Sequence, residues 1–130
     1  MKVETRINKT KIITEFVDLL SSIDGVEIAA WGNDFTPGTP LVIYRCMGKI
    51  NRLIQNRIER FTEWSFVVRI YANSSVECTQ ISDQIDDVLK PVGFIEKNIS
   101  DHFDSDSRTH TFTSVYSILL DEYGCSYNIK

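Results

Sequence analysis

The chain has 130 residues, a length typical of one compact domain. Hydrophobic residues make up 42% and charged residues 25%, which excludes a disordered chain, and no apolar run approaches the roughly 20 residues that a membrane-spanning helix needs. The formal net charge of −4 disfavours sequence-independent binding to duplex DNA, because that binding depends on a basic excess.

The first part of the chain predicts a helix and two strands. Apolar residues recur every three or four positions over residues 8–23, which indicates an amphipathic helix that stops at Gly25. A short strand follows over 26–31. Two prolines and a glycine then predict a loop over 33–40, and the β-branched and aromatic residues of 41–46 predict a second strand.

The segment 47–61 is ambiguous, because its apolar spacing fits a helix while both of its neighbours are strands. We favour an extended hairpin arm, since antiparallel pairing of those neighbours needs a short return. Strict alternation over 64–72 predicts the clearest strand. Its residues Trp64 and Phe66 are expected in the core, with a stacking platform for single-stranded nucleic acid as the alternative.

A second helix is predicted over about residues 75–90. Ser74 and Glu77 have the spacing of a capping box at its start, and Pro91 with Gly93 marks its end. Three aspartates on its outer face serve either a partner or solubility. They are Asp83, Asp86 and Asp87.

The last part of the chain predicts two more strands and a tail. A strand over 94–99 leads into an acidic, serine-rich turn over 101–108, and the longest strand covers 110–121. The tail, 122–130, is mostly polar and could be flexible. The order of elements predicts a single α+β domain over 1–130, with a mostly antiparallel sheet and two helices packed on one face.

The two clearest strands also carry apolar side chains on their second face. A second apolar face is not ordinary solvent surface, so we expect it to be covered either by another subunit or by the segment 46–62 folding over it. The residues concerned are Val67, Tyr71, Val115 and Leu119.

Charge is distributed unevenly along the chain. Residues 45–69 hold six basic and two acidic side chains, a net +4, whereas residues 77–106 hold eight acidic and two basic side chains, a net −6. Patches of opposite charge can pair head to tail between subunits, although a solvated surface is the simpler interpretation. The candidate interface residues are Arg45, Arg52, Arg57, Arg60, Asp83, Asp86, Asp87, Asp101, Asp104 and Asp106.

No motif in the sequence predicts a catalytic, cofactor or metal site. The three cysteines form no CxxC pair, which argues against a disulfide framework or a zinc site and fits a reduced cytosolic compartment. His102 and His110 flank the acidic turn without a third soft ligand nearby, and the calcium-loop pattern counted from Asp104 fails. The sequence contains neither a nucleophile elbow nor a phosphate-binding loop.

Five segments occur in a characteristic order: 40–44 (PLVIY), 64–72 (WSFVVRIYA), 74–77 (SSVE) opening a helix, 92–94 (VGF), and a closing strand over 111–120. This order resembles the tail-terminator, or tail-completion, proteins of long-tailed bacteriophages and prophages. The resemblance covers about residues 35–121 of the chain.

The resemblance implies a structural protein rather than an enzyme. Proteins of this family form a homohexameric ring that caps the tail tube, ends its elongation and joins the tail to the head connector. The implied partners are further copies of the chain, the major tail tube protein and a head-completion protein, with DNA passing through the lumen without specific binding. The implied location is the tail or neck of the virion, after assembly in the host bacterial cytoplasm. The arginine-rich segment 50–60 departs from what a lumen-facing loop would carry, so the loops that line the channel stay undecided.

Two other classes of function stay open. A small binding module could use the basic loop 45–60 on an acidic partner or on single-stranded nucleic acid, and its affinity would fall steeply with salt. The arginines concerned are Arg52, Arg57 and Arg60. A small enzyme could instead use His102 or His110.

Overall fold

Four long strands form the frame of the protein: β3 (Leu41–Leu53), β4 (Arg60–Ala72), β5 (Ile95–Asp104) and β6 (Thr109–Leu120). Three short strands complete the sheet: β1 (Lys2–Arg6), β2 (Glu27–Ala30) and β7 (Cys125–Tyr127). The computed structural model describes residues 2–6, 12–31, 40–53, 60–104, 109–121 and 125–127.

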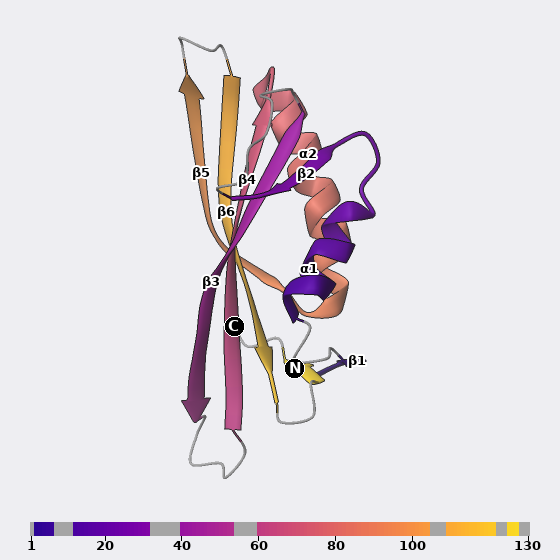
Figure 1. Cartoon of the computed structure of the whole chain (residues 1–130), viewed down its shortest axis with the longest axis vertical. Helices are drawn as coiled ribbons and strands as arrows, with labels where there is room; N and C mark the ends of the chain where they lie inside the picture. The colour runs from indigo at the N-terminus through magenta and orange to yellow at the C-terminus, as the bar shows by residue number, and fades with distance from the viewer. Residues whose placement is uncertain are drawn as a thin grey trace.

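These strands make a single sheet within the described residues. Their order is β1-β7-β6-β4-β3-β2, and β5 pairs with β6 off that path. Each pairing is antiparallel except that of β2 with β3, which is parallel. Both helices, α1 (Ile12–Ser21) and α2 (Ser75–Leu89), lie on the same side of the sheet (Figure 1). The predicted α+β class, with two helices on one face of a mostly antiparallel sheet, is confirmed.

The ends of the helices follow local signals in the sequence. α1 ends at Ser21, and the chain then turns through Gly25, whose φ of 76° is the left-handed conformation that glycine tolerates. At the start of α2, the backbone N–H of Glu77 donates to Ser74 Oγ at 3.1 Å, which is one half of the predicted capping box. Glu77 Oε1 is buried without a hydrogen-bond partner, so the reciprocal half is not made by that oxygen.

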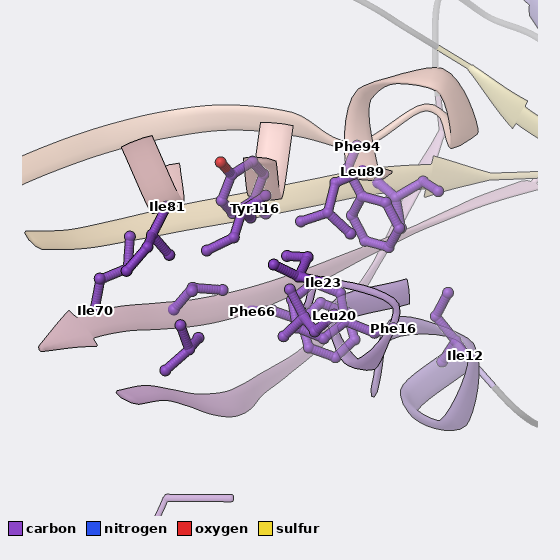
Figure 2. Packing of buried hydrophobic residues seen from close by; sticks show 14 of the residues in the cluster. Ile12, Phe16, Leu20, Ile23, Phe66, Ile70, Ile81, Leu89, Phe94 and Tyr116 are labelled. Atoms are coloured by element: carbon purple, nitrogen blue, oxygen red, sulfur yellow. The ribbon is translucent and has the colours of Figure 1, made fainter. Parts of the chain in front are cut away.

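A cluster of aromatic rings joins α1 to the sheet. Phe16 is fully buried and stacks on Phe66 of β4, with ring centroids 4.1 Å apart. Its ring also meets Phe94 at 5.4 Å, which brings in the segment before β5. Figure 2 shows these rings together with the apolar side chains of both helices and with Tyr116 of β6. We call this covered side of the sheet the core face and the opposite side the open face.

The extended interpretation of the ambiguous segment is confirmed for its described part. β3 continues to Leu53 and β4 begins at Arg60, and the two strands stay in register from Gly48 opposite Ser65 to their ends. Trp64 is partly buried against the core and Phe66 is fully buried, as the alternation predicts. Residues 54–59, like 8–11 of the first predicted helix and 33–39 of the predicted loop, lie outside the described residues.

Two boundary predictions are wrong. The predicted acidic turn begins too early, because residues 101–104 belong to β5 and pair with β6 as far as Asp104 opposite Thr109. A polar edge strand is possible there because β6 supplies its backbone hydrogen bonds and its other edge needs no apolar cover. The tail is not uniformly irregular either, since β7 lies within it and pairs with both β6 and β1. The strand β1 was not predicted.

Removal of the Phe16 ring tests this description of the core. Phe16→Ala is expected to lower the free energy of unfolding by about 3–5 kcal/mol, because it leaves a cavity beside the rings of Phe66 and Phe94. Ile13→Ala on the same helix is the matched control: Ile13 is 45% exposed, and its loss should cost less than about 1 kcal/mol. Urea denaturation followed by circular dichroism measures both variants. Equal losses would contradict the assignment of the core face.

Candidate assembly surfaces

The two long hairpins point to opposite ends of the sheet. β4 pairs with β6 from Thr62 opposite Leu120 to Ala72 opposite His110. The end of β3 at Leu53 and the start of β4 at Arg60 therefore lie at the Leu120 end, and the end of β5 and the start of β6 lie at the Ala72 end (Figure 1). β4 is 13 residues long, so the two ends are separated by about 40 Å.

This arrangement separates the predicted charges. β3 carries Arg45, Lys49 and Arg52 and no acidic residue. Arg45 and Lys49 are exposed. Arg60 opens β4 at the same end as Arg52, to which the register brings it close. We call residues 45–53 and 60–62 the basic arm.

The acidic candidates lie at the other end. Asp101 and Asp104 occupy the last positions of β5, which together with the start of β6 we call the acidic hairpin. The structure describes the strand positions, but not the side chains, of Arg52, Arg60, Asp101 and Asp104. Arg57 and Asp106 lie outside the described residues. The two sets lie on strands at opposite sides of the sheet and are offset along it, by about three register positions between Arg45 and Asp101 and about twelve between Arg52 and Asp104. They therefore do not form a single site within the subunit.

The aspartates of α2 form a third candidate surface, on the outer side of the helix layer. Asp83 and Asp87 are exposed there. Asp86 differs, because it makes contacts within the subunit: Asp86 Oδ2 lies 3.2 Å from Lys90 Nζ, and Asp86 Oδ1 accepts a hydrogen bond from the Tyr116 hydroxyl. The ten candidate residues are therefore distributed over three surfaces.

A buried tyrosine joins three elements through its hydroxyl. Tyr116 of β6 is 1% exposed, and its hydroxyl contacts Asp86 of α2 and Glu96 Oε2 of β5, the latter at 2.9 Å. Burial raises the pKa of Tyr116 far above its ordinary value, and hydrogen bonding to the two carboxylates raises this pKa further. The cluster was not predicted, because Asp86 and Glu96 are distant from Tyr116 in sequence and the alternation of β6 marks Tyr116 only as a core residue.

The open face is covered by neither helix. Val67, Tyr71 and Val115 are half-buried there, whereas Leu119, the fourth residue predicted for this face, is buried with 8% exposure. Beside them, the Arg69 guanidinium lies 4.5 Å from the centroid of the Trp31 ring, and Arg69 Nε donates to Thr113 Oγ1 at 3.2 Å. The idea that residues 46–62 fold over this face is wrong for their described part, because those residues extend the sheet in its own plane.

Within the described residues, no group of three or more His, Cys, Asp or Glu is placed to hold a metal ion, and no helix has the length and apolarity to cross a membrane. Cys46 and Cys78 form no disulfide. Comparison with models of known protein families gives no match for the chain, and no curated protein matches it significantly. The resemblance to tail terminators therefore stays a prediction.

Replacement of Tyr116 tests the hydroxyl cluster. Tyr116→Phe is expected to lower the free energy of unfolding at pH 7 by about 1–3 kcal/mol, because two partly buried carboxylates lose their donor while the ring remains. Urea denaturation measures this loss. Val115→Ala, on the open face of the same strand, is a control for general weakening of β6. A Tyr116→Phe variant as stable as the wild type would contradict the cluster.

The same pair of proteins predicts a dependence on alkaline pH. The unfolded chain releases the Tyr116 proton near its ordinary pKa of 10.0, whereas the folded protein keeps that proton because its pKa is raised. The stabilisation is therefore fully present below pH 10 and falls above it, by about 1.4 kcal/mol per pH unit. Urea denaturation between pH 8 and pH 11 should show the difference between wild type and Tyr116→Phe shrinking. A constant difference would contradict the raised pKa.

Proposed function

We propose that this protein is a structural assembly protein of a tailed bacteriophage or prophage, of the tail-terminator kind. In this proposal, copies of the chain form a ring that caps the tail tube, ends its elongation and presents a surface to the head connector. The ring is hexameric if the chain follows the family that it resembles. The protein acts by binding rather than by catalysis, and its place is the tail or neck of the virion.

The observation that carries the proposal is the placement of opposite charges at opposite ends of one sheet. A subunit with a basic arm at one end and an acidic hairpin at the other has complementary surfaces that cannot meet within the same copy. Contacts between unlike surfaces repeat from copy to copy and close into a ring when the rotation between copies allows it. The open face supports the same proposal, because half-buried apolar side chains are typical of a surface that is covered on assembly.

A binding module is the second candidate, favoured by the exposure of Arg45 and Lys49 on the basic arm. Such a module would bind an acidic protein or single-stranded nucleic acid with an affinity that falls steeply as salt increases. A ring of identical subunits would instead show a defined mass. Light scattering of the pure protein and binding to single-stranded DNA at two salt concentrations separate the two candidates.

The direct test uses tail tubes from the phage or prophage that encodes the chain. Light scattering measures the mass of the protein alone and after mixing with these tubes, and electron microscopy shows where the protein binds. A sixfold mass, or rings confined to tube ends, is the expected result. A monomer that ignores tube ends and binds single-stranded DNA would contradict the proposal and favour the binding module.

A further inference from the structure

Beyond the ring itself, the sheet has two long strand edges that are unpaired within the described residues. β2 pairs with β3 only from Leu41 to Tyr44, and the last backbone bond on that side joins Trp31 N–H to the Tyr44 carbonyl oxygen at 2.8 Å. From Arg45 to Leu53 no described strand lies on the outer side of β3. At the other side of the sheet, β5 pairs with β6 alone.

An unpaired edge is a row of backbone donors and acceptors that can template another strand. The directions of the two edges suit each other. β3 is antiparallel to β4, β4 to β6, and β6 to β5, so β3 and β5 run in opposite directions within one copy. A second copy placed beside the first in the same orientation therefore brings its β5 antiparallel to the free part of β3. No two-fold rotation is needed, which suits a ring.

The charges of the two edges are complementary. The free part of β3 carries three basic residues and no acidic one. β5 carries Asp101 and Asp104 toward its end, while its Lys97 is bound to Glu63 at 3.4 Å and its Glu96 to the Tyr116 hydroxyl. Asp101 and Asp104 are the remaining acidic residues of β5, and an antiparallel partner would bring their strand positions toward those of Arg45 and Lys49.

β3 also carries features that hinder indiscriminate pairing. Its register with β4 shifts between Cys46 and Gly48, and Gly48 has a φ of 126°, so the strand is bulged there. Met47 at the bulge is 58% exposed, and the neighbouring Lys49 is exposed as well. A bulge and a lysine are common protections of an edge strand. They disfavour pairing with an arbitrary strand more than pairing with one of opposite charge.

The overlap of the two edges also defines a geometry for the ring. The register gives each residue of β3 and β5 a level along β4. On this scale, the midpoint of the free part of β3 and the midpoint of β5 lie five to six residues apart. Bringing them into full overlap slides neighbouring copies by about 19 Å, while the four strands β3, β4, β6 and β5 are about 19 Å wide. Each copy is thus displaced along the strands by as much as its four strands are wide. The strands are then tilted by about 45° to the ring axis, close to the tilt of closed barrels.

We propose that copies of this chain join edge to edge, with Arg45–Leu53 of β3 forming an antiparallel pair with Ile95–Asp104 of β5 in the next copy. The partner is a second copy of the chain, and the contact rests on the proposed ring. Backbone hydrogen bonds supply the strength of the contact, and the opposed charges select which edge meets which.

Hydrogen exchange followed by mass spectrometry tests the contact in the wild-type protein. Assembled protein, alone or on tube ends, is compared with the monomer fraction. Peptides from residues 45–53 and 95–104 should exchange at least about tenfold more slowly on assembly, because their outer amides become paired. Peptides from residues 63–71 of β4, a strand already paired on both sides, should change little and serve as the internal control.

A charge-reversal pair gives a second test. Arg45→Glu combined with Lys49→Glu should raise the dissociation constant of the assembly by about tenfold or more, because like charges then face each other across the contact. Glu15→Lys combined with Asp18→Lys reverses the same number of charges at exposed positions of α1, outside the candidate interface residues, and should change the dissociation constant by less than about twofold. Circular dichroism verifies that both variants fold. If one of them does not fold, hydrogen exchange of the wild-type protein still tests the contact.

The outcomes separate this proposal from the proposed function. Rings without slower exchange at residues 45–53 would overturn the edge contact and leave the function standing. A greater loss of assembly from the α1 variant than from the β3 variant would overturn the contact in the same way. A protein that stays monomeric alone and with tube ends would overturn both. Slower exchange at both edges, with the larger loss in the β3 variant, supports the contact.

Discussion

The structure depends on the burial of one face of a long antiparallel sheet beneath two helices. The helices bring enough apolar surface to cover the middle of the core face, where Phe16 stacks on Phe66, but they leave the hairpin ends uncovered (Figure 1). Neither helix covers the open face, although Leu41, Ile43 and Leu119 on that side are buried. The described ends of the hairpins extend beyond the helices, and their charge distinguishes one end from the other.

The hydroxyl of Tyr116 links this core to the edge of the sheet. It holds Asp86 of α2 and Glu96 of β5 at one point, so the helix layer and an edge strand are fixed to each other by hydrogen bonds as well as by packing. Glu96 is thereby bound within the subunit, and so is Lys97 through Glu63. The start of β5 is held internally, whereas the aspartates at its end extend past these contacts.

Much of the fold could be predicted from the sequence because local pattern and tertiary burial agree there. Alternation marks the core side of β4 and β6, and the apolar stripe of α1 matches its buried residues Ile12, Phe16 and Leu20. The pattern fails where backbone pairing alone makes a strand, as in β1, β7 and the polar end of β5. The Tyr116 cluster could not be predicted for a related reason: three residues far apart in sequence meet only after the helix packs on the sheet.

The separation of charge along the sheet constrains how copies can associate. Along the strands, Arg52 and Asp104 lie about 40 Å apart, whereas Arg45 and Asp101 are offset by only about 10 Å, with three strand spacings of about 4.8 Å between β3 and β5. Both separations exceed the Debye length of about 8 Å at physiological salt, so these charges interact weakly within a subunit. In the proposed ring, another copy brings its acidic hairpin to each basic arm. In the proposed assembly, backbone pairing alone would tolerate many registers along a bulged edge. The positions of the basic residues on β3 and of the aspartates on β5 would favour one of these registers, so charge supplies the geometric selection that a ring of fixed size requires.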